Sequence, residues 1–262
     1  MPIARRALTI RRARLACLAL LAWCAQPALA QGANACPQPL RAVVLALDSP
    51  STGITKFLMA STDALLAAAE VRRQVLPMPF VRIPLELQAG RADVVTVSYS
   101  ALEPYRDLVV SVQFLRMPVL LYEFNGPHDN AEPTDAIGIV RGAPLPPALA
   151  ASAGQLQQVN NYEAMFQMLA ARRLAGAVGA RPTADLYLQD NPGVAALVKP
   201  GAQVDERRMA IHFSRHLPKA CLDHLVERVQ SRGLAITQQL FTRQYPALNH
   251  ADYRVPVQVI KP

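Results

Sequence analysis

Short apolar runs alternate with amphipathic segments through the first half of the chain. The runs are rich in β-branched residues, as buried strands are, while the segments between them repeat apolar side chains at helical spacing. We predict strands at 40–47, 71–76 and 94–97 and helices at 54–69 and 83–88. Gly90 follows the second helix, where a glycine in the left-handed conformation commonly ends a helix. This order predicts a parallel sheet with crossover helices.

The second half of the chain repeats the alternation. We predict strands at 118–124, 135–140, 156–159, 175–178 and 209–213, and helices at 146–153, 162–171, 181–188, 217–230 and 234–245. The long apolar strand at 118–124 suits a crossover into a second lobe, and 209–213 suits the return to the first. Gly233 separates the last two predicted helices.

The first 30 residues predict an export signal. Five arginines between residues 5 and 14 precede the apolar stretch Leu15–Trp23, which is short for a membrane span. Small residues at 28 and 30 form a cleavage site, so we expect a cut after Ala30. The alternative is an uncleaved signal anchor.

Removal of this segment changes the electrostatic picture. The chain has 27 basic and 19 acidic residues, and the segment holds five arginines and no acid, which leaves a net charge of +3 on 232 residues. No cluster of Lys and Arg with interleaved aromatic residues remains, so we expect no nucleic-acid partner.

Polar side chains follow the predicted strand at 94–97. Ser98, Tyr99 and Ser100 come directly after it, and Arg106 lies a few residues further on. Open α/β folds build ligand sites at the carboxyl ends of strands, and the planar fork of Arg suits a carboxylate. Tyr99 and Phe80 could stack on an apolar part of a ligand, although we expect Phe80 in the core.

The order of motifs resembles a known family. These motifs are Pro77–Arg82, then Leu87, Gly90, Arg91 and Asp93 around the end of the second helix, then Ser98, Ser100 and Arg106, then Phe114 and Pro118, with 137–143 and Gly233, Ile236 and Tyr245 later in the chain. Their order is similar to that of bacterial extracellular solute-binding proteins of family 3, the polar-amino-acid type. The resemblance implies a two-lobed α/β fold of periplasmic-binding-protein type II, each lobe a mainly parallel sheet flanked by helices, that closes on a small solute for an ABC-type importer.

The resemblance also implies boundaries and ligand residues. Lobe 1 would comprise 31–121 plus 213–262, and lobe 2 would comprise 122–212. Asp48 stands where the family often contacts the ligand, and Ser98, Ser100 and Arg106 stand where it holds a carboxylate. The spacing from Asp93 to Arg106 is one residue longer than the family's; a bulge would restore Arg106, which would otherwise be a surface residue.

The second lobe departs from the family in a way that favours anions. No acid stands at 179–181, where amino-acid binders neutralise an ammonium group. Arg141 instead follows a predicted strand at a helix N-terminus, a position that attracts anions. With Arg106 and Arg181 it would bias the cleft toward an organic anion; the alternative is that Arg141 and Arg181 are solvated surface residues.

Cysteine and histidine usage bears on metals and the redox environment. Cys36 and Cys221 remain after signal cleavage, and an isolated pair in the periplasm tends to form a disulfide. The alternative is two buried thiols. No Cys–His or His–His spacing suits a metal, and His212 with His216 should lie on a strand leaving into a loop.

These observations favour a monomeric periplasmic solute-binding protein without chemistry, cofactor or metal. Its partners would be a small polar or anionic solute, an amino acid or organic acid, and the membrane permease of an ABC-type transporter. One alternative is a dehydratase-like enzyme of the same fold, for which Asp48 or Glu103 are the candidate acid–base groups. Another is a ligand-sensing partner of a membrane protein.

Overall fold

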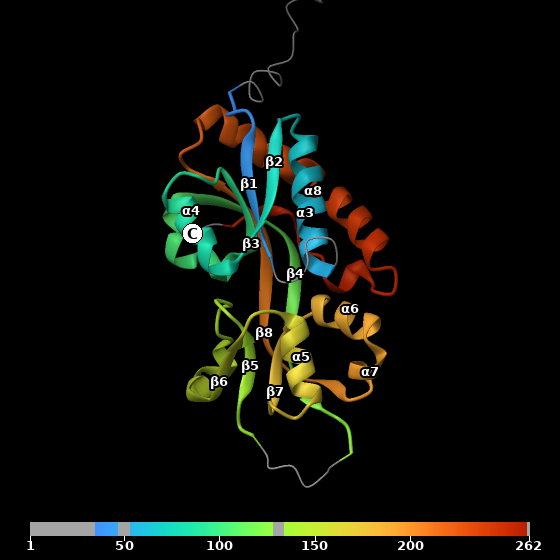
Figure 1. Cartoon of the computed structure of the whole chain (residues 1–262). Helices are drawn as coiled ribbons and strands as arrows, with labels where there is room; N and C mark the ends of the chain where they lie inside the picture. The colour runs from blue at the N-terminus through green and yellow to red at the C-terminus, as the bar shows by residue number, and fades with distance from the viewer. Residues whose placement is uncertain (1–34, 47–52, 128–133, 261–262) are drawn as a thin grey trace, which may run out of the picture.

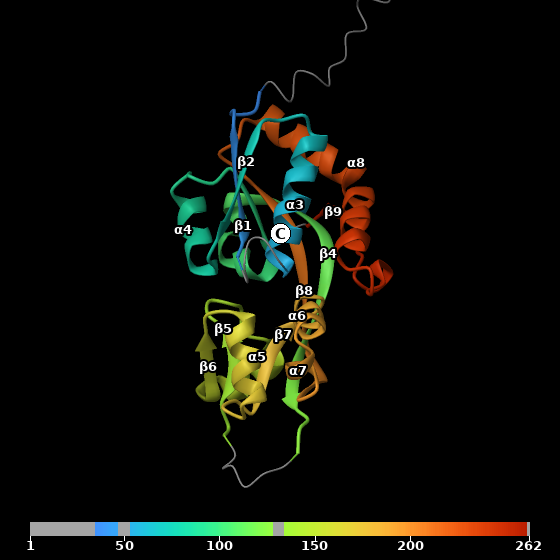
Figure 2. The same ribbon diagram turned by 45° about the vertical axis from the view of Figure 1, so that its right-hand side comes forward.

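The computed structural model describes residues 35–46, 53–127 and 134–260. Two α/β lobes lie one above the other and are joined by two long strands (Figure 1, Figure 2). The elements of the first half are β1 (Leu40–Leu45), α3 (Gly53–Ala68), β2 (Arg73–Met78), η1 (Phe80–Arg82), α4 (Ile83–Gln88), β3 (Val94–Ser98), η2 (Tyr99–Leu108) and β4 (Val109–Phe124). Those of the second half are β5 (Ile137–Val140), η3 (Pro147–Gln155), β6 (Leu156–Val159), α5 (Tyr162–Ala170), β7 (Gly176–Ala180), α6 (Thr183–Asp190), α7 (Pro192–Ala195), β8 (Val198–Ser214), α8 (Lys219–Gln244), η4 (His250–Asp252) and β9 (Gln258–Val259).

A single sheet with the strand order β2-β1-β3-β8-β4-β7-β5-β6 runs through both lobes. Each lobe contributes three parallel strands: β1 pairs with β2 and β3, and β5 pairs with β6 and β7. The antiparallel strands β4 and β8 lie between the two sets and pair with each other along nearly their whole length. This arrangement confirms the predicted α/β fold with two lobes, each built around a parallel sheet.

Most predicted elements lie within a few residues of the observed ones, but two predictions were wrong. The strands predicted at 118–124 and 209–213 are parts of much longer strands, β4 and β8. The two helices predicted around Gly233 are one helix, α8, and Gly233 is buried inside it. A Cβ at this position would lie 3.1 Å from Cγ1 of Val257, so the glycine accommodates the C-terminal segment instead of ending a helix.

The motif around Asp93 stabilises lobe 1. Gly90 ends the α4 region with φ +64°, as predicted. The buried carboxylate of Asp93 accepts hydrogen bonds from the backbone N of Arg41 at 2.8 Å and from its Nε at 3.1 Å and Nη2 at 2.9 Å. Arg91 instead pairs with Glu86 at the surface. These motif residues therefore fasten α4 and β3 to β1.

The C-terminal segment closes the edge of β4 in lobe 1. β9 pairs with β4 at Val112 and Gln113, and the backbone N of Arg116 donates to the carbonyl of Tyr253 at 2.7 Å. Tyr253 packs on Phe241 of α8 with ring centroids 5.2 Å apart. Residues beyond Tyr245 therefore protect a sheet edge that would otherwise expose unpaired backbone groups.

Cys36 and Cys221 form a disulfide with Cα atoms 4.8 Å apart, which confirms the predicted pairing. It ties the residues that precede β1 to the first turns of α8. The described helices include none that combines the length and the apolar character needed to span a membrane. The predicted signal segment at 1–30 lies outside the described residues.

Candidate functional site

The carboxyl ends of strands from both lobes meet at one cavity. Its volume is about 150 Å³, and its lining residues are Ala46, Pro79, Phe80, Val81, Val140, Arg141 and Asn160. These residues directly follow or end four parallel strands, β1 and β2 in lobe 1 and β5 and β6 in lobe 2. The ends of parallel strands are where open α/β sheets bind ligands. We therefore take this interlobe pocket as the candidate site.

A tight turn in lobe 2 forms one wall of the pocket. The turn runs from Val140 to Ala143, whose N donates to the carbonyl of Val140 at 3.0 Å. Gly142 adopts φ +80°, and a Cβ there would lie 3.0 Å from Val81 and 3.3 Å from Phe80. Only a glycine allows this backbone to approach lobe 1 so closely. The lobes therefore touch at the mouth of the pocket.

The polar groups of the pocket favour an anion. Arg141 is exposed, and its side chain makes no hydrogen bond or ion pair with any described residue. Asn160 stands two residues before α5, whose N-terminus is capped by Asn161 accepting from the N of Ala164 at 2.8 Å. The positive end of a helix dipole and a free guanidinium both attract negative charge. The other lining residues that the structure describes are apolar, so the pocket suits a small solute with an apolar body.

The structure places the other predicted ligand residues at different points. Asp48 lies outside the described residues. Ser98 is buried at the end of β3, and Ser100 is exposed on η2. Tyr99 stacks on the buried ring of His212, with centroids 6.5 Å apart.

Among the cavities lined by described residues, Arg106 and Arg141 line different ones. It is exposed and lines a cavity of about 60 Å³ with Tyr99, Arg215 and the first residues of β4. This cavity lies at the end of β4 and β8 remote from lobe 2. No bulge returns Arg106 to the interlobe pocket, because the ten residues of η2 carry the chain to the start of β4.

Arg181 is engaged inside lobe 2. Its Nε lies 2.5 Å from Oδ2 of Asp185, and Asp185 also accepts a hydrogen bond from the hydroxyl of Tyr122 at 3.2 Å. Burial opposes the charge of Arg181, but the hydrogen bond and the charge of Asp185 outweigh it and raise the pKa of Arg181. Arg181 is therefore already neutralised, and the structure does not bring it together with Arg106 and Arg141.

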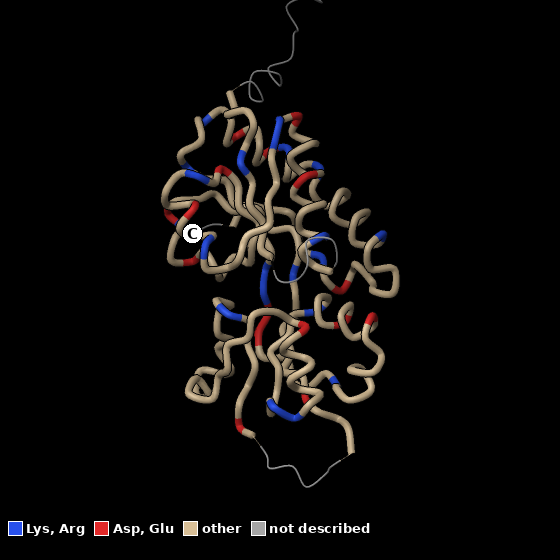
Figure 3. Tube along the Cα trace, in the orientation of Figure 1, with Lys and Arg blue, Asp and Glu red and all other residues tan. Residues whose placement is uncertain are grey.

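The sequence prediction missed Arg207, a buried cation on β8. Its side chain reaches lobe 2, where Nη2 donates to the carbonyl of Pro144 at 2.8 Å. A signal for it exists in the sequence: Arg207 continues the alternating series of Met209, Ile211 and Phe213, which face the core. Segments with opposite charges lie close together on the strands between the lobes (Figure 3).

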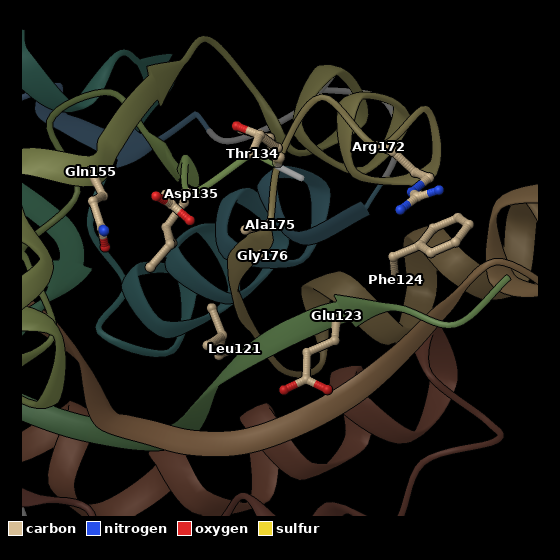
Figure 4. Close-up of a pocket in the computed structure, with 11 residues that line it drawn as sticks. Leu121, Glu123, Phe124, Thr134, Asp135, Gln155, Arg172, Ala175 and Gly176 are labelled. Atoms are coloured by element: carbon tan, nitrogen blue, oxygen red, sulfur yellow. The ribbon is translucent and has the colours of Figure 1, made fainter. Parts of the chain in front are cut away.

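A second, larger cavity of about 500 Å³ lies at the far end of lobe 2. Its lining residues are Leu121, Glu123, Phe124, Thr134, Asp135, Ile137, Gln155, Arg172, Leu174, Ala175 and Gly176. Arg172 lies beside the ring of Phe124 (Figure 4), with its Cζ 5.3 Å from the centroid. Strands β5 and β7 begin here, so the cavity lacks the converging strand ends of the interlobe pocket. Among the described residues no group of His, Cys, Asp and Glu is arranged to hold a metal ion.

Comparisons with known proteins identify the fold. No family model matches the chain, and no curated protein matches it by sequence. The arginine-, lysine-, histidine-binding protein ArtJ from Geobacillus stearothermophilus is similar over 82% of this chain and 98% of that chain, with a TM-score of 0.63 and 14% identity. The GluR0 ligand-binding core from Nostoc punctiforme, in complex with L-glutamate, is similar over 79% and 99%, with a TM-score of 0.61 and 14% identity.

The periplasmic VFT2 domain of BvgS from Bordetella pertussis is also similar, over 78% of this chain and 92% of that chain, with a TM-score of 0.60 and 16% identity. The chain therefore has the two-lobed fold of periplasmic binding proteins. The fold implied by the sequence motifs of the family 3 solute-binding proteins is confirmed.

Proposed function

We propose that this protein is a divergent family 3 solute-binding protein that captures a small polar or anionic solute between its lobes. The observation that carries the proposal is the interlobe pocket, where four strand ends from two lobes surround the guanidinium of Arg141, which has no partner among the described residues. The solved structures with the same fold include a ligand-binding core with L-glutamate and a binding protein for arginine, lysine and histidine. An organic acid or an acidic amino acid suits Arg141 better than a basic one, because like charges repel.

The first test is native mass spectrometry of the purified protein, followed by denaturing release of any small molecule it carries. A stoichiometric acid supports the proposal. If nothing is carried, a thermal-shift screen of small organic acids and amino acids follows, since a ligand that binds only the folded state raises the unfolding temperature. A protein that carries no solute and responds to none of them contradicts the proposal.

Substitution of Arg141 tests the site itself. We expect Arg141→Gln to weaken binding of the solute roughly tenfold or more, because it removes the charged donor that would form a hydrogen bond with the solute. The matched control is Arg173→Gln, which removes an exposed arginine from the opposite end of the same lobe. Equal affinities of the two variants would place the solute elsewhere.

The cellular setting belongs to the same proposal. Cleavage after Ala30 would release the protein into the periplasm as a monomer that serves the permease of an ABC-type importer. Lobe 1 would comprise 31–121 and 213–262, and lobe 2 would comprise 122–212. The N-terminal sequence of the exported protein and the effect of a gene deletion on uptake of the identified solute test these points.

A ligand-sensing role is a second candidate, because a periplasmic domain of BvgS has the same fold. Co-purification with a membrane protein other than a permease would favour it. An enzymatic role would need an acid–base group in the pocket. Glu103 is exposed on η2 and does not line it, and Asp48 lies outside the described residues. Recovery of the bound solute chemically intact after incubation would argue against catalysis.

A further inference from the structure

The cavity at the far end of lobe 2 is large enough for a small solute. Its volume of about 500 Å³ falls within the range of known small-molecule sites. Its floor is apolar and includes Leu121 of β4, Ile137 of β5 and Leu174. Gly176 leaves room for this floor, because a Cβ there would lie 2.8 Å from Cδ1 of Leu121. The cavity and the interlobe pocket share none of the lining residues that the structure describes.

In lobe 1 an ion pair closes the equivalent place. Helix α4 is followed by Gly90, which has φ +64°. Three residues after this glycine, the backbone N of Asp93 donates to the carbonyl of Arg41 at 2.8 Å. The carboxylate of Asp93 in turn accepts a hydrogen bond from Nη2 of Arg41 at 2.9 Å. The pair therefore links the start of β3 to the start of β1.

Lobe 2 repeats this backbone without the ion pair. Helix α5 is followed by Arg172, which has φ +58°. Three residues after this arginine, the backbone N of Ala175 donates to the carbonyl of Ala136 at 2.7 Å. The two alanines therefore stand where lobe 1 has Asp93 and Arg41. Because neither alanine can form an ion pair, the place is open in lobe 2, and Ala175 lines the cavity.

Arg172 adopts a left-handed backbone conformation that favours glycine. Lobe 1 has Gly90 at this place, so the side chain of Arg172 is held there at some cost in stability. Its guanidinium lies against Phe124, with Cζ 5.3 Å from the ring centroid (Figure 4). Backbone strain of this kind gathers at binding sites, where the strained side chain has a use. The strain therefore points to a role for the guanidinium in the cavity.

Opposite charges lie on the two sides of the cavity. Asp135 stands on one side and Arg172 on the other (Figure 4). The carboxylate of Asp135 makes no hydrogen bond or ion pair with a described residue. Glu123 is the other acid among the described lining residues, and Nζ of Lys199 lies 3.7 Å from its Oε2, which offsets its charge. Asp135 and Arg172 are therefore the two poles of the cavity.

The sheet sets the distance between these poles. Strand β7 lies between β4 and β5. Arg172 packs on Phe124, the last residue of β4, whereas Asp135 stands two residues before β5. Neighbouring strands are about 4.8 Å apart, so the two sides lie about 10 Å apart across the apolar floor. A solute whose two charges share one carbon reaches only one pole, whereas a longer chain with a charge at each end reaches both.

We propose that this cavity is a second binding site, for a small zwitterion with its ammonium and carboxylate groups at opposite ends of an aliphatic chain. The ammonium group would bind the carboxylate of Asp135, and the carboxylate would accept hydrogen bonds from the guanidinium of Arg172. The methylene groups would lie on the floor formed by Leu121, Ile137 and Leu174. The ω-amino acids are the simplest members of this class. This second site is independent of the proposed function.

Ligand-observed NMR titration of the purified protein tests the site with a homologous series. The probes are β-alanine, γ-aminobutyrate, δ-aminovalerate and ε-aminocaproate, each compared with its α-amino isomer. We expect the affinity to rise along the series by at most about fourfold per buried methylene. The tightest probe should bind about tenfold more tightly than its α-amino isomer, which reaches one pole only. If no ω-amino acid binds at concentrations up to about 10 mM, the second site is wrong.

Substitution of Asp135 tests the negative pole. Asp135→Asn should weaken the tightest probe about tenfold, because it removes the charge that faces the ammonium group. The matched control is Asp190→Asn, which removes an exposed acid at the end of α6, outside the cavity lining. Its affinity should stay within about twofold of wild type, since exposed charges contribute little. Equal losses in the two variants would overturn the assignment.

Arg172→Gly separates binding from folding at the positive pole. Glycine is the residue of lobe 1 at this place and suits the left-handed backbone, so the unfolding temperature should not fall. The affinity for the tightest probe should nevertheless fall about tenfold, because the guanidinium is lost. Retained affinity in this variant would remove Arg172 from the site and contradict the zwitterion as its ligand.

Arg141→Gln distinguishes the second site from the interlobe pocket. This variant should leave the affinity for the tightest ω-amino acid unchanged, because Arg141 does not line the cavity. If it weakens that probe and Asp135→Asn does not, the probe binds between the lobes; the second site is then wrong and the proposed function stands. A protein that binds ω-amino acids in this cavity and no other solute would support the second site and contradict the proposed function.

Discussion

His212 should make the stability of this protein depend on pH. Its ring is fully buried, Nδ1 accepts a hydrogen bond from the hydroxyl of Ser111 at 2.7 Å, and Nε2 donates to the carbonyl of Val97 at 3.2 Å. Burial lowers the pKa of His212 to about 4, against 6.5 for a free side chain. Replacing His212 with Gln removes the titrating group and keeps a polar side chain that stays neutral.

The sign of the effect follows from proton uptake. Below a pH of about 6.5 the unfolded chain binds a proton at this histidine and the folded protein does not. The free energy of unfolding therefore decreases as the pH is lowered, until the folded protein also binds the proton near pH 4. One pKa unit corresponds to about 1.4 kcal/mol. The loss should be about 2 kcal/mol at pH 5 and about 3 kcal/mol below pH 4.

Urea unfolding at about pH 8 and about pH 5 measures this difference. The wild-type protein should lose about 2 kcal/mol more than His212→Gln between the two conditions, because titration of the carboxylates is common to both. The exposed His216, replaced by Gln, is the matched control and should behave as wild type. Parallel curves for the wild type and His212→Gln would refute the reasoning.

Three further predictions concern stability. Replacing Cys36 and Cys221 with Ser opens a loop with a sequence separation of 185 residues and should lower the free energy of unfolding by about 5 kcal/mol on the chain-entropy model, measured by urea unfolding. Asp93→Ala should cost about 2 kcal/mol because it removes a buried carboxylate that accepts three hydrogen bonds from the half-exposed Arg41, whereas loss of the more exposed Asp63 pair should cost below about 1 kcal/mol; equal losses would contradict the burial argument. Deleting residues 247–262 should lower the unfolding temperature and promote aggregation, seen by light scattering, because the edge of β4 is uncovered.

Local patterns were sufficient for most of the fold. The alternation of apolar runs and amphipathic segments predicted the parallel strands of both lobes, because the residues that each strand buries form one continuous apolar run in the sequence. It missed the length of β4 and β8. Those strands pair mainly with each other. Their polar stretches between the lobes are strands only because they form hydrogen bonds with a strand about 90 residues away in the sequence. Gly233 indicated a helix end in the sequence. In the structure it lies inside α8, where the absence of a side chain lets Val257 of the C-terminal segment pack closely against the helix.

The site was less predictable than the fold. The motif that marked Ser98 correctly indicated a strand end, but Arg106 follows it through η2 to a different cavity. Arg207 stands in a charged run of the sequence, and its partner Pro144 lies 63 residues earlier. Periodicity could assign Arg207 to the buried face of a strand. No local pattern could show that this face lies between two lobes.

By itself the sequence determined the class of fold, the disulfide candidates and the polar residues at strand ends, because these depend on hydrophobic period, turn chemistry and residue type. Only the tertiary structure decided which strand ends face one another, which arginines are neutralised and which donors remain unused. These properties depend on distances between segments far apart in the chain. Arg181 and Arg141 both follow strands in the sequence. Asp185, one helical turn further on, forms an ion pair with Arg181, whereas Arg141 has no ion-pair partner among the described residues.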